Sequence, residues 1–319
     1  MRLATGYRLP PVEIAAIWAI STLVVILAVA IFLIGYDALV ANLAKLRPAV
    51  IPLCLLLMAW QVGGRFLRWI WYARCLGLPL SWREGALFYG AGLGMTLTPG
   101  RLGELLRLWF LERRFAAPYR RIVGLYVMDR VADAVAYVIL FALGSISYSQ
   151  GTPVALSGIV VVAFVLVALM RPWPVLSALT GAYVVIGHGR NLVLWLRRAV
   201  RNTSELSQPR VFLPGLVIGT IGWLAAPLLL TLVLAQMGAH LPLLHAIAIY
   251  AAGALAGGAT MLPGGGGGTE AVLLGLLRAS EVPIDAAVAA VIVTRVTFLW
   301  APVGLGIIAL PIAMKAVSR

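Results

Sequence analysis

Leu262-Pro263-Gly264-Gly265-Gly266-Gly267-Gly268-Thr269-Glu270 is the stretch from which the fold of this 319-residue chain can be predicted. It lies between two apolar runs, 246–261 and 271–277, each shorter than the roughly 20 residues that a helix needs to cross a bilayer. Proline removes a backbone donor and glycine carries a large backbone entropy cost, so a helix cannot continue through this stretch. We predict a helix that enters the membrane, breaks here and turns back.

The break brings a charge to membrane depth. An unwound backbone is tolerated there only where it is buried in protein or lines a watery cavity. Glu270 closes the stretch, and an ionisable residue within a membrane segment is by default a candidate for a functional site. Glu270 is therefore a candidate site residue.

An earlier stretch, Leu97-Thr98-Pro99-Gly100-Arg101-Leu102-Gly103-Glu104, repeats these features. In both cases an arginine follows within the next apolar run: Arg130 lies 26 residues after Glu104, and Arg295 lies 25 residues after Glu270. Pro-Gly, then a glutamate, then such an arginine is more than composition would give twice by chance. The sequence predicts two copies of one unit, each built around a broken hairpin. The predicted helix-breaking positions are Pro99, Gly100, Gly103, Pro263, Gly264, Gly265, Gly266, Gly267 and Gly268.

The composition is that of a helical membrane protein. The chain is 62% hydrophobic and only 11% charged, and its mean hydropathy is +1.00. The net charge of +14 indicates basic flanks of membrane spans, not a nucleic-acid partner. Two cysteines form no disulfide framework, and three histidines show no metal-ligand spacing.

The charge distribution predicts the topology. The apolar runs expected to span the membrane are 14–34, 50–71, 122–148, 154–170, 211–237 and 286–314. Residues 172–210 are basic and of mixed polarity, which predicts an amphipathic linker on the cytoplasmic surface. With both termini in the cytoplasm, most lysines and arginines fall inside, and we expect a multi-pass protein of the cell membrane (inner or plasma membrane).

The two units then face opposite ways, because three full crossings separate the hairpins. The first repeat is 48–148 with a hairpin at 86–110, and the second is 211–316 with a hairpin at 246–279. The predicted fold class is an all-α polytopic membrane protein. It forms a single integral domain, 1–319, with about six transmembrane helices plus two re-entrant broken hairpins in an inverted repeat.

The residues that recur in the two predicted units are suited to binding an anion. Each half-helix after a Pro-Gly begins with free N–H groups and a positive dipole end, where a phosphate is stabilised. We expect Glu104 and Glu270 to pair with Arg130 and Arg295, which need partners inside a membrane. Two interpretations stay open: structural ion pairs that fix the hairpins, or residues of a translocation path. Weaker candidates are Arg101, Arg107 (one turn from Glu104, and a simple ion-pair partner for it) and Asp129.

Arg65 and Arg68 share one face at the end of the second predicted span. They either extend to cytoplasmic headgroups or form a phosphate-binding pair beside the first hairpin. Other chemical signals are poor. Residues 90–94 lack the context of a dinucleotide site, the five glycines lack the Lys-Ser/Thr of a P-loop, and no catalytic triad is present. We expect no enzyme activity, no metal and no cofactor.

At these residues the chain resembles the lysylphosphatidylglycerol synthase transmembrane family. The resemblance rests on 97–104, on 262–270 and on Val293-Thr294-Arg295, and it covers about residues 10 to 316. It implies movement of a lipid between leaflets, such as an aminoacylated phospholipid or a polyprenyl-linked glycan, and partners among glycosyltransferases or lipid-biosynthesis enzymes. The synthases carry a soluble aminoacyl-transferase domain after the membrane part, whereas this chain stops at Arg319, so we expect no lipid synthesis.

The function expected from the sequence is a flippase-like translocase for an anionic lipid that works by alternating access. Two alternatives stay open. A membrane scaffold for a lipid-modifying enzyme would leave liposomes inert. An enzyme acting on a lipid phosphate would form product in detergent.

Overall fold

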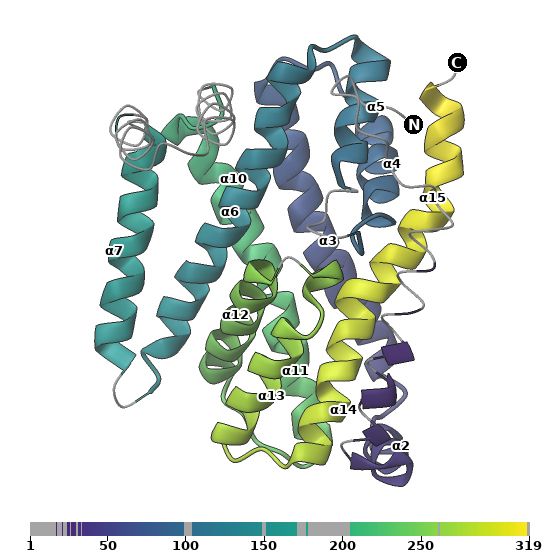
Figure 1. Ribbon diagram of the computed structural model, residues 1–319, viewed down its shortest axis with the longest axis vertical. Coiled ribbons are helices and arrows are strands. Elements are labelled where there is room, and N and C mark those ends of the chain that lie inside the picture. The colour runs from purple at the N-terminus through teal and green to yellow at the C-terminus, as the bar shows by residue number, and fades with distance from the viewer. Residues whose placement is uncertain are drawn as a thin grey trace, which may run out of the picture.

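The computed structural model describes residues 34–98, 104–148, 151–170, 205–260 and 262–317, together with residue 177 and scattered residues between 17 and 32. Every regular element in these ranges is helical, as Figure 1 shows, and this confirms the predicted all-α class. Residues 99–103 of the first predicted break lie outside the described residues. So does nearly all of the predicted linker 172–210.

The order of helices occurs twice. A long helix is followed by two short helices with a break between them, and then by a second long helix. In the first half these are α3 (Val50–Cys75), α4 (Trp82–Leu93), α5 (Leu106–Phe115) and α6 (Tyr119–Ser145). In the second half they are α10 (Pro209–Trp223) with α11 (Ala225–Gln236), α12 (Leu243–Ala259), α13 (Gly268–Ala279), and α14 (Ile284–Arg295) with a π-helical turn η3 (Val296–Trp300) and α15 (Ala301–Val317). Outside this order, α2 (Tyr36–Ala44) packs on α14, and α7 (Gly151–Met170) packs on α6.

Three helical stretches of the described chain are long and apolar enough to cross a membrane: 50–75, 209–236 and 284–317. α6 has 27 residues, and at about 1.5 Å per residue its length also matches a bilayer, but charged residues in its middle lower its hydropathy. The chain is thus a multi-pass membrane protein, and the number of six crossings stays a prediction.

The second break lies between α12 and α13. A short 3-10 turn, η2 (Pro263–Gly265), follows α12, and the backbone then bends through Gly267 before α13 begins. Gly264, Gly265 and Gly267 have φ angles of 61°, 71° and 79°, a left-handed conformation that residues with a Cβ rarely adopt. The glycine run is therefore required by the geometry of the turn.

The two halves pack on each other reciprocally. α4 of the first hairpin lies on α15, the last helix of the second half, and α12 of the second hairpin lies on α6, the last helix of the first half. The first long helices, α3 and α10, pack together. In Figure 1 the two hairpins lie toward opposite ends of the long axis. Each hairpin therefore packs on the last helix of the opposite half.

Glycines bring these helices close together. A methyl group on Gly94 would lie 2.7 Å from the carbonyl carbon of Gly306, where α4 meets α15. On Gly144 it would lie 2.5 Å from the backbone nitrogen of Ala248, where α6 meets α12. Small residues at helix contacts allow backbones to approach closely inside a membrane. Both reciprocal contacts are therefore backbone against backbone.

We predict that Gly306→Ala lowers the thermal stability of the detergent-purified protein by about 1–3 kcal/mol, because the added methyl meets the backbone of α4. Gly304→Ala on the same helix is the matched control, since a methyl there has no neighbour within 4 Å in the described part of the chain. The control should leave the unfolding temperature unchanged or raise it. Equal effects of the two variants would show that the α4–α15 contact is not tight.

Candidate functional site

Charged side chains gather inside the first half, between α3, α5 and α6. The cluster, as far as the structure describes the chain, consists of Arg65, Arg68, Glu104, Arg107, Asp129, Arg130 and Asp133. Four arginines face three carboxylates, which leaves a net charge of +1. All of these residues are buried except Arg130, whose side chain is 23% exposed. We call this set the first-half cluster.

Arg68 is the most deeply buried member. Its side chain is 0% exposed and lies between two carboxylates of α6. Its Nε donates to Asp129 Oδ1 at 2.8 Å, and its Nη2 donates to Asp133 Oδ1 at 2.7 Å. Asp133 Oδ1 also accepts from Trp223 Nε1 of α10 at 2.9 Å. Because an uncompensated charge is very costly to bury, these bonds join α3 and α6 to a helix of the second half.

Glu104 lies just before α5 and bridges two arginines. Its Oε2 is 3.4 Å from Arg107 Nη1 and accepts a hydrogen bond from Arg130 Nη2 at 3.2 Å. Only 1% of Glu104 is exposed. The predicted pairing of Glu104 with a later arginine is confirmed, and so is its pairing with Arg107.

In the described chain all four arginines of the cluster carry buried donors without acceptors, and Arg65 and Arg107 carry two each. Within the described residues, Nε and Nη2 of both Arg65 and Arg107 are buried and have no hydrogen-bond partner. Each guanidinium lies over an aromatic ring instead: Arg107 is 4.0 Å from the centre of Tyr89, and Arg65 is 4.8 Å from that of Trp223. Ring faces attract cations but accept hydrogen bonds poorly. The cluster thus has unused capacity for an anion.

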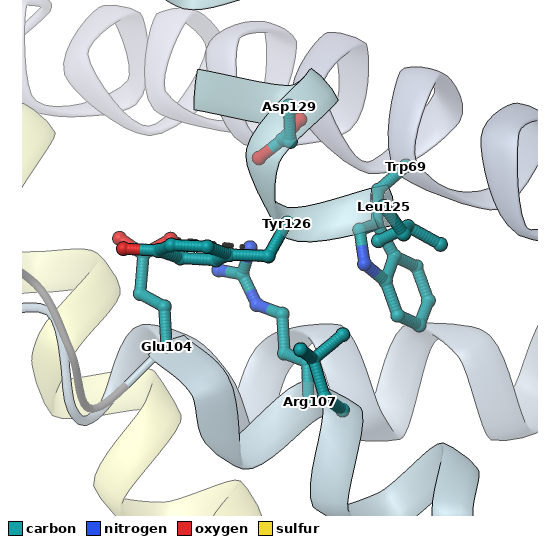
Figure 2. A pocket seen from close by; sticks show the side chains of 7 residues that line it. Trp69, Glu104, Arg107, Leu125, Tyr126 and Asp129 are labelled. Carbon is teal, nitrogen blue, oxygen red and sulfur yellow. Dashed lines mark ion pairs between the residues drawn. The ribbon is translucent and has the colours of Figure 1, made fainter. Parts of the chain in front are cut away.

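A small hollow lies between α5 and α6 beside these groups. Figure 2 shows Arg107 of α5 and Glu104, which precedes this helix, extending toward α6, with the ring of Tyr126 alongside them. The hollow is lined by Trp69, Glu104, Arg107, Leu108, Leu125, Tyr126 and Asp129. It has room for about one water molecule. A lipid headgroup does not fit, so the cluster is closed in this conformation.

The second half carries one ion pair at the equivalent place. Arg295 Nε lies 2.6 Å from Glu270 Oε1, as the sequence predicts. Arg295 Nη2 also donates to the carbonyl oxygen of Gly264 at 2.9 Å. The arginine at the end of α14 therefore holds both the start of α13 and the break that precedes it.

Apolar side chains pack against the second break. Leu97, which precedes the first break, is fully buried and contacts Gly264: a methyl group on Gly264 would lie 2.6 Å from Leu97 Cδ2. Leu299 and Val303, around the start of α15, complete this contact. The side chains of Leu97, Leu299 and Val303 thus form an apolar contact beside Gly264.

Several sequence expectations can be placed on this geometry. Arg107 and Asp129 belong to the first-half cluster, whereas Pro99, Gly100, Arg101 and Gly103 lie outside the described residues. The suggestion that Arg65 and Arg68 extend to surface headgroups is wrong for this conformation, because both are buried and pair with carboxylates of α6.

Asp133 was missed by the sequence analysis, although its spacing was a usable signal. It lies four residues after Asp129 and three after Arg130, so the three share one face of α6. Trp223 offered no such signal, because its bond to Asp133 depends on how the two halves pack.

Comparison with known proteins gives consistent matches. The family model described as "Lysylphosphatidylglycerol synthase TM region" matches residues 16–306. A relative in Methanothermobacter thermautotrophicus, described as a "UPF0104 membrane protein", is 23% identical, and the alignment covers 88% of this chain and 90% of the relative. Both matches extend over both halves of the molecule.

We predict that Asp133→Ala destabilises the protein by about 3–5 kcal/mol, because it removes one of the two carboxylates that compensate the buried Arg68. Thermal unfolding in detergent, followed by size-exclusion chromatography of the remaining soluble protein, measures the loss. Glu205→Ala is the control, since its ion pair with Arg121 is half-exposed at 3.5 Å and should contribute at most about 1 kcal/mol. Similar melting curves for Asp133→Ala and wild type would contradict the structural role of Asp133.

Proposed function

The chain belongs to the lysylphosphatidylglycerol synthase TM region family, and from this premise we propose that it is a lipid translocase. It moves a lipid that carries an anionic phosphate group between the two leaflets of a cell membrane. The family membership and the apolar helices support a multi-pass membrane protein with a lipid-related role. The translocation itself is our proposal.

The observation that carries the proposal is the positive charge of the first-half cluster. Burying an arginine without a matching carboxylate is unfavourable, so a purely structural cluster would balance its charges. Here four arginines face three carboxylates, and both Arg65 and Arg107 keep N–H donors without acceptors in the described chain. A phosphate-bearing headgroup is attracted by the positive charge and supplies the missing acceptors.

The closed hollow supports movement between conformations. A headgroup needs far more room than one water molecule, so the helices around the cluster must separate for a lipid to enter. The reciprocal contacts α4–α15 and α12–α6 offer two equivalent ways to open, one from each face. This is the arrangement expected of an inverted repeat that alternates access while the acyl tails stay in the bilayer.

The substrates that fit are aminoacylated phospholipids and polyprenyl-linked phosphates, since both combine an anionic group with long apolar tails. The positive-inside pattern of the sequence supports cytoplasmic termini in an inner membrane. An enzyme that makes or uses the transported lipid is the partner that this function implies.

We predict that Glu270→Gln and Arg295→Gln each abolish lipid exchange in proteoliposomes while leaving the protein folded. Glu270 and Arg295 hold the second break, and its position controls whether the hairpins part. Fluorescent phospholipids and a fluorescent polyprenyl phosphate are placed in the liposomes, and exchange between leaflets is read by quenching from outside.

Arg278→Gln, at an exposed position on α13, is the matched control and should exchange lipid at the wild-type rate. Wild-type exchange by both Glu270→Gln and Arg295→Gln would remove the second ion pair from the pathway. Absence of exchange for every lipid by well-folded wild-type protein would contradict the translocase and favour a scaffold.

A further inference from the structure

We propose that Glu104 is an internal substitute for the phosphodiester of the lipid headgroup: its carboxylate occupies the phosphate site in the closed molecule and leaves when a lipid binds. This inference rests on the proposed function, and it assigns the headgroup phosphate to the first half of the molecule.

Glu104 lies between the donors of two arginines. One oxygen, Oε2, lies 3.4 Å from Arg107 Nη1 and 3.2 Å from Arg130 Nη2. Arginine side chains bind carboxylates and phosphates through the same planar set of N–H donors. A site that holds this carboxylate therefore has the donors that a phosphate needs.

The carboxylate of Glu104 and a phosphodiester are equivalent in charge. A carboxylate and a phosphodiester each spread one negative charge over two terminal oxygens. Exchanging one for the other leaves the net charge of the cluster at +1, so the exchange requires no additional charge to be buried. Each terminal oxygen of a phosphodiester can accept more than one hydrogen bond, so the group can also accept from the unused donors of Arg107.

Glu104 can move without disturbing the carboxylates that hold Arg68. Asp129 and Asp133 both belong to the long helix α6, and both bind Arg68. Glu104 instead precedes α5 and directly follows the first break. A shift of this short segment removes its carboxylate from Arg107 and Arg130 and leaves the core pairs intact.

The second half does not offer the same site. Arg295 divides its donors between Glu270 and the carbonyl oxygen of Gly264, and Gly264 itself packs on Leu97. Within the described chain, this half gathers a single arginine and a single carboxylate around its break. The phosphodiester site is therefore expected in the first half alone.

The test measures binding of a short-chain phosphatidylglycerol to the detergent-purified protein. The readout is the fluorescence anisotropy of a labelled headgroup analogue. Glu104→Gln keeps the size of the side chain and removes its charge, so it should bind this lipid about tenfold more tightly than wild type or better. Arg107→Gln should bind it at least about tenfold more weakly. Soluble glycerophosphoglycerol shows whether the phosphodiester suffices without acyl tails. If it binds, and Glu104→Gln binds it more tightly, the site recognises the phosphodiester alone. If only the lipid binds, the site also requires the tails.

Two controls isolate the effect. Glu84→Gln makes the same chemical change in the same hairpin, in a partly exposed pair with Arg114, and should leave affinity unchanged. A short-chain diacylglycerol, which lacks the phosphate, should show no difference between Glu104→Gln and wild type.

The inference would be overturned if Glu104→Gln bound phosphatidylglycerol as tightly as wild type or more weakly. It would also be overturned if Arg107→Gln kept the wild-type affinity. The Arg107→Gln result decides the question if Glu104→Gln does not fold. A failure of the translocase function appears differently: wild-type proteoliposomes would exchange no lipid, whatever the affinities of the variants.

Discussion

The burial of Arg68 is the constraint on which the interior of this protein depends. A guanidinium with no exposed surface is compatible with folding only if carboxylates and acceptors surround it. Asp129 and Asp133 provide them from one face of α6, and Trp223 adds a donor to Asp133 from the other half of the chain. These bonds fix α3, α6 and α10 relative to one another. The hairpins are attached around this fixed centre.

Two kinds of contact hold the hairpins. Each hairpin packs backbone against backbone on the last helix of the opposite half, through Gly94 and Gly306 on one side and Gly144 and Ala248 on the other. At the second break, Leu97 contacts Gly264 together with Leu299 and Val303. Contacts of this kind have no directional bonds, whereas the ion pairs Glu104–Arg130 and Glu270–Arg295 attach each hairpin to the long helix that follows it.

Much of this arrangement could be predicted from the sequence because its signals are local. Proline and glycine runs locate helix breaks, and a buried glutamate followed by an arginine in the next apolar helix predicts an ion pair, as Glu270 and Arg295 show. The environment of Arg68 could not be predicted in this way. Two arginines near the end of a span fit either headgroup contact or burial, and only the packing of α3 against α6 and α10 distinguishes them. The contact between Leu97 and Gly264 joins residues far apart in the chain, so no local pattern reveals it.

The central claim is that an anionic headgroup enters the first-half cluster. Photo-crosslinking with a phosphatidylglycerol analogue that carries a photoreactive headgroup, followed by peptide mapping, tests it most directly. The account predicts labelling of residues around Glu104, Arg107 and Tyr126, and strong competition by unlabelled phosphatidylglycerol. Labelling confined to exposed apolar faces such as that of α7, with no competition, would contradict it.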